Sequence, residues 1–437
     1  MFGPYTCSET SDHMHMARSG ASKSGRKLFK RFAQDKSGNY AIITALAMPV
    51  LVGVAAFGTE EGLLLHNQKS MQHAADSAAA TAAVAVTAGA NDKGRLQARS
   101  VASSYGYVDG AADQTRVFVN SPPLSGRNMN NASAIEVKII QPQTKLFSSL
   151  WGSGRHTVAA RSVATPTGQP CILALNPSLS GSYSEQGSVT TNLIDCAVIV
   201  DSSSSSALNV GGSARLSTSF AGVVGGISGM SGISATYGTQ VHYHYVPDPY
   251  SDRSYPSFNG CDKHNYQTSK DDTLSPGVYC GGIQLTSNAR VTLRPGIYYI
   301  DGGSLQLSGQ STFSGTGVTL VFTSSSGSNY ATASISGGAV MNLMPPSTGP
   351  TAGIAIFGDR SMPAGTIFKF TGGDRQAVGG AIYIAKGAVQ WAGNATANQQ
   401  CTQIVADTIT MVGTSGLKVN CAGYGTVAIT TPAMLLE

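Results

Sequence analysis

The sequence predicts one N-terminal transmembrane helix that continues into a small α+β region, followed by a mostly-β domain. Three observations lead to this fold class. Residues 39–59 form a long apolar run, NYAIITALAMPVLVGVAAFGT, with no charged side chain. An alanine-rich stretch follows it, and beyond residue 165 short β-branched runs alternate with Gly, Ser and Asn turns. The 437 residues are enough for two or three domains.

The apolar run has the length of a membrane span. About 20 residues at a rise of ~1.5 Å each cross the ~30 Å hydrocarbon layer of a bilayer. Pro49 removes one backbone donor in the middle of the run, which membrane helices tolerate more readily than helices in water. A buried core helix and a cleaved signal peptide are the alternatives. We favour a retained anchor, because 38 residues precede the run and no clear cleavage site follows it.

Positive charge is concentrated ahead of the span. Residues 1–38 carry seven basic and three acidic side chains, whereas the whole chain has a net charge of +5. Basic residues beside a span stay on the cytoplasmic side, so we expect a cytoplasmic tail over residues 1–38 in a single-pass protein of the bacterial inner membrane. The C-terminal domain would be periplasmic or surface-exposed. The basic cluster lacks interleaved aromatic residues, so a nucleic-acid partner is not expected.

The cysteines fit an exported domain. Six of the seven follow the span, and an even number in an oxidising compartment indicates up to three disulfides. None has C-x-x-C spacing, so neither zinc nor thioredoxin-like chemistry is indicated. We expect pairing in sequence order, because the members of each such pair are only about 20 to 25 residues apart, although fifteen connectivities are open. The candidates are Cys171, Cys196, Cys261, Cys280, Cys401 and Cys421.

Residues 60–165 read as a helical stalk with a small sheet. High helix propensity continues beyond the span, which predicts one helix of about 50 residues, half inside and half outside the membrane. A second helical piece is expected over residues 95–105, and strand-like runs cover residues 116–119, 134–141 and 157–164. A long N-terminal helix whose outer half packs on a small sheet is a pilin-like arrangement.

Several residues around the span form a recognisable pattern. Gly38 precedes the span, Glu60 follows it, and a Gln-x-Ala-Ala-Asp-x-Ala-Ala motif is formed by Gln72, Ala74, Ala75, Asp76, Ala78 and Ala79. With this pattern, residues 29–90 resemble the N-terminal region of the TadG-like (TadE/TadG) family of Flp, or tight-adherence, pilus-assembly proteins. The resemblance implies a non-enzymatic envelope scaffold or surface-contact protein. Its implied partners are other pilus-assembly proteins in the inner membrane and periplasm.

Two features near the span concern processing and self-association. Processed pilins carry Glu at the fifth position after the cleaved Gly, whereas this chain has Ile43, so we expect no cleavage and a permanent anchor. Gly58 and Gly62 have G-x-x-x-G spacing, which favours close helix approach and self-association through the span. A plain, well-formed alanine-rich helix is the alternative interpretation of the motif.

Residues 166–437 predict a Gly/Ser-rich β-solenoid, most simply a parallel β-helix, with a β-sandwich as the alternative. The segments beginning at Pro276 and Pro295 share a PG-x-Y frame 19 residues apart. No long helix is indicated, and glycines mark the corners. Predicted strands include residues 196–200, 214–217, 282–286, 290–293, 296–300, 304–307, 317–323, 352–357, 381–384, 403–405 and 408–412.

Candidate metal and carbohydrate sites are weak. His242 and His244 would share one face of a strand, with Asp248, Asp252 and His264 nearby in sequence, but an aromatic-rich surface loop is the favoured interpretation. The tyrosines of that stretch are suited to stacking on sugar rings. They are Tyr243, Tyr245, Tyr250 and Tyr255.

Catalytic signals are equally weak. Asp201, Ser203 and Ser205 match a D-x-S-x-S metal motif, but a run of serines satisfies it by chance. Asp271 and Asp272 would face opposite sides of a strand. Two Asp-Arg pairs, at 359–360 and 374–375, read as exposed. We therefore expect no enzyme, no metal and no cofactor. The alternative function is a membrane-tethered polysaccharide-active enzyme or glycan-binding adhesin.

Overall fold

The computed structural model describes residues 39–86, 91–150, 152, 154–372, 376–392, 401–418, 421, 424–429 and 433–437. Gly38, the basic tail over residues 1–38 and the Asp-Arg pair at 374–375 lie outside the described residues. The chain divides into two compact units. The first combines residues 1–66 with residues 144–156, and the second combines residues 67–143 with residues 157–437.

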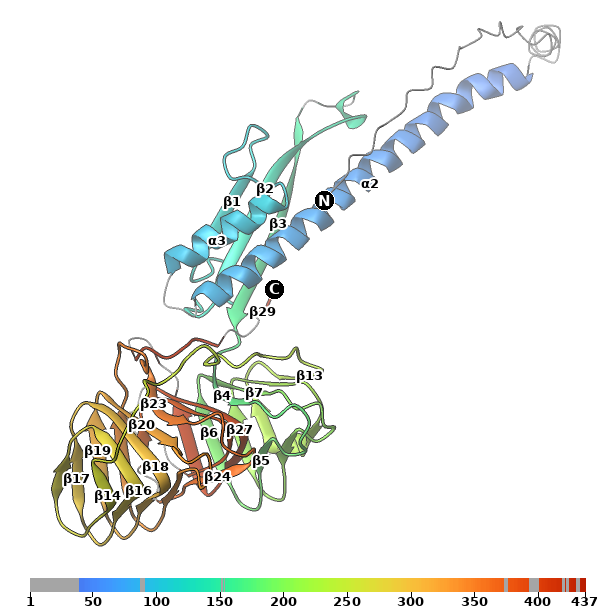
Figure 1. Ribbon diagram of the computed structural model, residues 1–437. Coiled ribbons are helices and arrows are strands. Elements are labelled where there is room, and N and C mark those ends of the chain that lie inside the picture. The colour runs from blue at the N-terminus through green and yellow to red at the C-terminus, as the bar shows by residue number, and fades with distance from the viewer. Residues whose placement is uncertain are drawn as a thin grey trace, which may run out of the picture. The chain divides into compact units, whose positions relative to one another are not determined.

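The apolar run opens one long helix, α2 (Asn39–Val86), drawn in blue in Figure 1. Its 48 residues agree with the expected length of about 50. Among the described residues, it is the one helix long and apolar enough to cross a membrane. Its large apolar side chains are exposed along the run, as Leu46 at 71% and Val54 at 67% illustrate. A soluble core helix would bury such side chains, so the core-helix alternative does not fit.

The C-terminal half of α2 packs in a small α/β domain. Helix α3 (Asn91–Ser104) and a four-stranded sheet in the order β1-β2-β3-β29 complete it. The strands are β1 (Arg116–Asn120), β2 (Ile135–Thr144), β3 (Arg155–Pro166) and β29 (Ala433–Leu435). In β1, Val117 and Val119 alternate with more exposed residues and face the core, as expected for a sheet covered on one face.

The fourth strand of this sheet comes from the far end of the described chain. β29 pairs antiparallel with β3, so that Met434 lies opposite Thr165. The whole β domain is therefore inserted, in sequence, between two neighbouring strands of the small sheet. The sequence had suggested a simple boundary at residue 165, and the return of residues 433–437 to the small sheet corrects that boundary.

The β domain follows as a series of short strands. Its first part contains β4 (Gln169–Ala174), β5 (Tyr183–Glu185), β6 (Thr190–Ile194), β7 (Cys196–Val200), β8 (Leu208–Val210), β9 (Arg215–Thr218), β10 (Phe220–Val223), β11 (Ile227–Ser228), the 3-10 turn η2 (Met230–Gly232), β12 (Ile233–Ala235) and β13 (Thr239–Val241).

Its second part is longer. It contains β14 (Lys263–Thr268), β15 (Asp272–Leu274), β16 (Gly277–Leu285), β17 (Arg290–Leu293), β18 (Gly296–Leu307), β19 (Thr312–Thr316), β20 (Val318–Thr323), β21 (Thr332–Ile335), β22 (Val340–Met344), β23 (Ile354–Gly358), β24 (Thr366–Phe370), β25 (Ala377–Val378), β26 (Gly380–Trp391), β27 (Thr402–Met411) and β28 (Thr414–Lys418).

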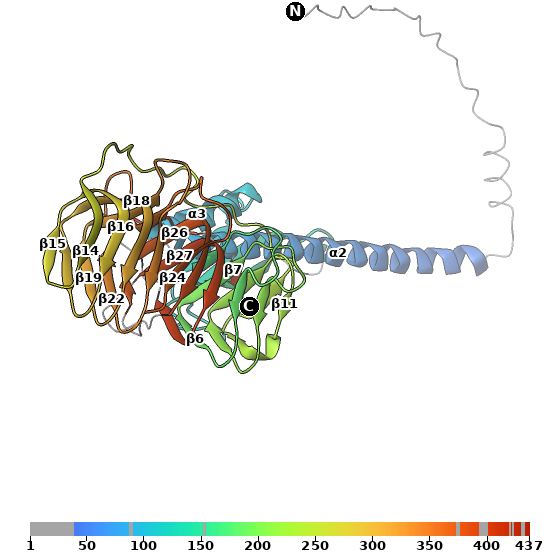
Figure 2. The ribbon, with the colours of Figure 1, turned by 60° about the horizontal axis from the view of Figure 1, so that its bottom comes forward.

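Parallel ladders join these strands, and the first strand of the β domain, β4, lies inside the largest sheet and not at its edge. The largest sheet runs β13-β10-β7-β4-β27-β26-β23-β20-β18-β16-β14, so β4 lies between β7 and β27. The chain first builds outward from β4 to β13. Residues 242–262, which we call the strap, then carry it to the opposite edge, and it returns strand by strand until Ile404 of β27 pairs with Ile172 of β4. Figures 1 and 2 show the stacked strands.

Two smaller sheets complete the wall, in the orders β12-β9-β6-β28 and β15-β17-β19-β22-β25. One apolar core receives side chains from all three sheets, so the parallel strands close around it in a barrel-like arrangement. The largest sheet is also covered on its outer face. A second apolar core lies on that outer face. In β7, Val198 and Val200 point into the interior core, whereas Ala197 and Ile199 belong to the outer core. Burial on both faces explains the uninterrupted apolar sequence of this strand.

The predicted strand runs match closely. Residues 196–200 and 290–293 have the limits of β7 and β17. Two adjacent runs join in β18, where Gly302 and Gly303 adopt φ values of 69° and 68° that permit the bend between them. The repeated PG-x-Y frame marks equivalent corners, because Gly277 and Gly296 begin β16 and β18. A Cβ atom on Gly296 would lie 2.3 Å from Cγ of Pro276, so this corner requires glycine.

Candidate functional site

Glu60, the acidic residue after the apolar run, is hydrogen-bonded by a segment far away in sequence. Its carboxylate accepts backbone N–H bonds from Leu146, Phe147 and Ser148 at 3.2, 3.0 and 2.8 Å, and the Ser148 hydroxyl at 2.6 Å. Only 4% of Glu60 is exposed. The bonds from Ser148 lower the pKa of the carboxyl. Glu60 therefore remains a fully hydrogen-bonded carboxylate on the helix.

The segment that Glu60 holds forms one side of an apolar groove. We call residues 144–156, which comprise the end of β2, the start of β3 and the residues between them, the tip. A groove of about 550 Å³ lies between the tip and α2. It is lined by Pro49, Val50, Gly53, Val54, Phe57, Glu60, Phe147 and Ser148. Sequence inspection did not single out the tip, although its LFSSLW sequence between Lys145 and Arg155 was a readable signal.

The alanines of the sequence motif form the packing face of α2. Its four alanines, Ala74, Ala75, Ala78 and Ala79, are fully buried in the core of the small α/β domain, as are Ala82 and Ala83 one turn further on. Gln72 donates to Asp76 Oδ1 at 2.8 Å and to the Arg161 carbonyl at 2.9 Å, which ties the helix to β3. Small side chains let the helix backbone approach the sheet closely. Cβ atoms at Gly58 and Gly62 would meet nothing within 4 Å, and self-association there stays a prediction.

A charged cluster that the sequence did not reveal closes the small sheet. Arg161 contacts Glu136 Oε1 at 2.6 Å and Glu437 Oε2 at 2.5 Å. Burial would raise the pKa of Glu136, but hydrogen bonds from Asn120, Arg161, the Leu124 N–H and Ser125 outweigh it and lower the pKa to about 2. Glu437 follows β29, so this cluster joins the sheet to the strand that arrives last in sequence.

The strap covers the outer face of the largest sheet. In Figure 1 this yellow-green segment runs along the β domain from the β13 side to the β14 side. Tyr243 and Tyr250 are 3% and 0% exposed, and they pack in the outer apolar core with Val246. Of the four tyrosines, only Tyr245, at 57%, is well exposed, and Tyr255 is half-buried. The four side chains therefore do not form the exposed sugar-stacking surface that the sequence suggested.

A polar network fastens the strap to the sheet. Arg360 donates to the Tyr383 hydroxyl at 2.6 Å and to the Tyr250 carbonyl, and Tyr383 donates to Asp248 at 2.7 Å. Asp359 accepts the Tyr255 hydroxyl at 2.9 Å. The Asp359–Arg360 pair was expected to be exposed; both side chains are instead half-buried and bind the strap. Burial raises the pKa of Tyr383 well above its usual value.

Asp201 is part of the same attachment. Its Oδ1 accepts the N–H of Val246 in the strap at 3.0 Å, and burial raises its pKa to about 7. Ser203 donates its hydroxyl to the Pro177 carbonyl at 3.0 Å. The D-x-S-x-S match thus holds backbone segments together. Glu185 is a second buried carboxyl, and burial raises its pKa to about 7 beside the Tyr183 hydroxyl.

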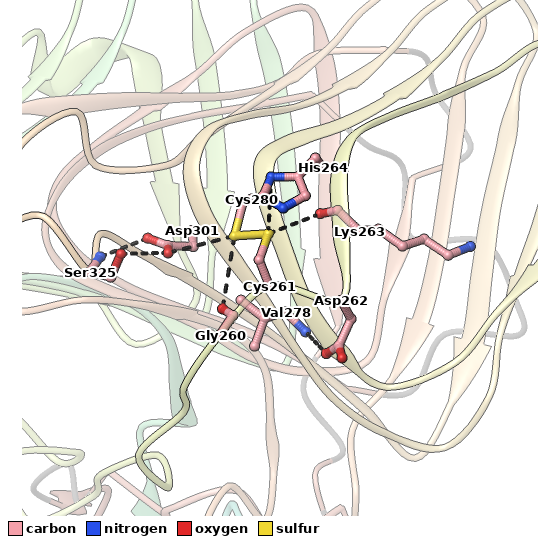
Figure 3. Close-up of a disulfide and its surroundings, with 9 residues drawn as sticks. All are labelled: Gly260, Cys261, Asp262, Lys263, His264, Val278, Cys280, Asp301 and Ser325. Atoms are coloured by element: carbon pink, nitrogen blue, oxygen red, sulfur yellow. Dashed lines mark hydrogen bonds between the residues drawn. A yellow bond between two sulfur atoms is a disulfide. The ribbon is translucent and has the colours of Figure 1, made fainter.

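The predicted histidine pair does not lie on a strand. β13 ends at Val241, and His242 has a left-handed φ of 54°. Asp248 is bound to Tyr383, and Asp252 is exposed. His264 lies elsewhere, with Nδ1 at 3.4 Å from Sγ of Cys261 (Figure 3).

The six cysteines pair in sequence order, as expected. The pairs are Cys171–Cys196, Cys261–Cys280 and Cys401–Cys421, with Cα–Cα distances of 5.5, 5.9 and 4.7 Å. Such distances suit disulfides. The Cys261–Cys280 bond joins the end of the strap to β16, beside Asp301 and Ser325 (Figure 3). His264, Cys261 and Cys280 are close enough to share an ion, but both sulfurs are used in the disulfide.

Asp271 and Asp272 have separate tasks at the β14 edge. Asp271 accepts the Arg290 N–H at 2.9 Å, and Asp272 accepts the Tyr266 hydroxyl at 2.5 Å. Both carboxyl groups are exposed.

No protein-family model, no curated protein and no solved structure matches this chain. The contacts described above are therefore the basis for a functional proposal.

Proposed function

We propose that this chain is a non-enzymatic, single-pass inner-membrane component of Flp/Tad-type pilus assembly, acting as an envelope scaffold or surface-contact protein. The observation that carries the proposal is the exposed apolar half of α2. Side chains such as Leu46, Leu51 and Val54 are 66–71% exposed. A bilayer is the solvent that suits such a helix, because its side chains are apolar and a helix pairs its own backbone groups, apart from the one donor that Pro49 removes.

The small α/β domain supports the pilin-like part of the proposal. The Gln-x-Ala-Ala-Asp-x-Ala-Ala motif lies where α2 packs on the sheet, and its buried alanines account for the small residues that carry the resemblance to TadG-like proteins. The same helix thus supplies an anchor in one half and a folding surface in the other. A membrane-anchored stalk requires both a helix that stays in the bilayer and a packed domain outside it.

A parallel β-helix is the fold we propose for the β domain. Neighbouring strands form parallel ladders, whereas a β-sandwich is built from antiparallel sheets. Parallel strands of successive turns surround a shared core, as in solenoid proteins. The polar groups on the covered face hold the strap, and this use of Asp248, Asp359 and Arg360 supports a scaffold role.

Membrane fractionation and thiol labelling in intact cells test the anchor. We expect the chain in the membrane fraction after alkaline extraction. A membrane-impermeant thiol reagent should leave Cys7 unlabelled and label the other six cysteines only after reduction. Recovery of the chain in the soluble fraction, or free thiols at these six positions, would contradict the proposal.

Deletion of the coding sequence in its native bacterium tests the pilus role. We expect loss of assembled Flp-type pili and their recovery on complementation. Normal pili in the deletion strain would refute this role. Turnover of a polysaccharide by the purified full chain, abolished by replacing Asp271 and Asp272 with Asn, would instead establish the enzymatic alternative, and stable sugar binding without turnover would indicate an adhesin.

A further inference from the structure

We propose that the tip, residues 144–156, inserts into the outer leaflet of the bilayer beside α2, as a second membrane contact positioned by Glu60. This inference rests on the proposed membrane anchor. It extends the proposal from a single crossing helix to a helix accompanied by a short re-entrant segment.

Depth along the helix is the first observation. Phe147 and Ser148 line the groove together with α2 residues from Pro49 to Phe57. These helix residues precede Glu60 by 3 to 11 positions, which places them about 4 to 16 Å further along the axis at ~1.5 Å per residue. They belong to the outer half of the predicted span. If α2 crosses a bilayer over residues 39–59, the tip lies beside hydrocarbon-facing residues.

The surface of the tip is the second observation. Leu146 and Phe147 are 52% and 43% exposed, next to the exposed apolar side chains of α2. Lys145 and Arg155 flank the apolar part, and the sequence has no acidic residue between Glu136 and Glu185. Apolar side chains bordered by basic ones suit the boundary between acyl chains and anionic phospholipid headgroups. The groove between the tip and α2, with the small Gly53 in its floor, has the apolar lining that an acyl chain needs.

Glu60 is the positioning residue. A carboxylate at the edge of a membrane is unfavourable unless hydrogen bonds satisfy it. Three consecutive backbone N–H groups of the tip and the Ser148 hydroxyl do so. The same hydrogen bonds keep those N–H groups from facing lipid without a partner. Non-helical backbone at membrane depth requires that its polar groups be paired in this way. Each side of the contact therefore removes a desolvation penalty of the other.

Fluorescence quenching by brominated lipids tests the insertion. The chain has two tryptophans, and Trp391 is 1% exposed in the interior of the β domain, where it serves as an unquenched reference. In a W151F background, Phe147→Trp reports on the tip, Phe57→Trp on the span, and Phe118→Trp, which is 42% exposed on β1, on the aqueous part. Each full-length variant is reconstituted into phosphatidylethanolamine–phosphatidylglycerol vesicles with lipids brominated on the acyl chain.

We expect vesicle flotation of all variants, and quenching of Phe147→Trp that is at least about twofold stronger than that of Phe118→Trp and similar to that of Phe57→Trp. Flotation with a quenched Phe57→Trp but an unquenched Phe147→Trp would overturn the insertion of the tip and leave the anchor intact. Failure to float would overturn the anchor and the tip together.

Glu60→Gln, combined with Phe147→Trp, tests the positioning role. Removal of the charge weakens four hydrogen bonds, so we expect quenching by bromines near the acyl-chain end to fall while quenching near the headgroups rises. Glu61→Gln is the matched control, because Glu61 is exposed and adjacent. Unchanged deep quenching in the Glu60→Gln variant would contradict positioning by Glu60.

Discussion

Arg161 offers the sharpest test of how the small sheet is held together. Replacement by Met keeps much of the side-chain volume but removes the guanidinium from Glu136, which is 2% exposed, and from Glu437. The lowering of the Glu136 pKa from 4.5 to about 2 corresponds to ~3 kcal/mol of stabilisation, at 1.36 kcal/mol per unit. Breaking a buried pair leaves the carboxylate uncompensated and typically costs 3–5 kcal/mol.

We expect a loss of about 2 to 3 kcal/mol, because Arg161 is partly exposed and three other donors to Glu136 remain. Hydrogen exchange in β2 and β3 should become roughly 30- to 150-fold faster, since 1.4 kcal/mol is a factor of ten. Arg116→Met, at an exposed position of β1, is the control. Exchange in β2 and β3 that stays within twofold of the parent protein would refute the reasoning.

The same cluster gives a pH dependence. The folded-state pKa of Glu136 is depressed, so its stabilisation is fully present above the unfolded pKa of ~4.5 and is lost as pH falls towards about 2. The difference in stability between the parent protein and the Arg161→Met variant should therefore shrink over that window. A difference that is constant from neutral pH to pH ~2 would show that the charge of Glu136 is not responsible.

Three further predictions concern packing, buried acid and the strap. Ala78→Leu should destabilise the small α/β domain by about 1 to 3 kcal/mol, because Ala78 is fully buried and a larger side chain overpacks the core. Gln68→Leu, on the exposed side of α2, should have no such effect, and chemical denaturation measures both variants. Glu185 has a raised folded-state pKa of about 7, so its carboxyl ionises at lower pH in the unfolded chain, and the free energy of unfolding falls as pH rises from ~4.5 to ~7. Glu185→Gln should therefore raise the thermal midpoint at pH ~8 and change it little at pH ~5. An equal effect at both pH values would contradict this. Tyr383→Phe removes two hydrogen bonds under the strap and should speed limited proteolysis within residues 242–262, while the exposed Tyr245→Phe should leave the cleavage rate unchanged.

Local patterns predicted much of the fold. The apolar run and the alanine-rich stretch gave one helix, because both have high helix propensity and no strong stop signal before residue 89. β-branched runs between glycines gave strands such as β7 and β17, and short separations gave the three cysteine pairs. Each of these signals lies within a few dozen residues.

Contacts between distant residues were missed. Nothing in the sequence near Ile172 indicates that it pairs with Ile404, because any other apolar strand could form the same parallel hydrogen bonds with it. Glu60 and Ser148 are 88 residues apart, and both are common types in loops. The tyrosines of the strap were interpreted as a surface loop. Tyr243 and Tyr250 are buried because the strap crosses the outer face of the largest sheet, and the local sequence does not reveal which segment crosses that face.

The insertion of the β domain has a consequence for the order in which the small sheet forms during synthesis. When β3 emerges, its outer edge has no neighbour, and β29 follows only after the entire β domain has been made. An unpaired edge strand is a site for wrong pairing between chains. A chain cut short anywhere in the β domain leaves the edge of β3 open and leaves Arg161 without its contact to Glu437.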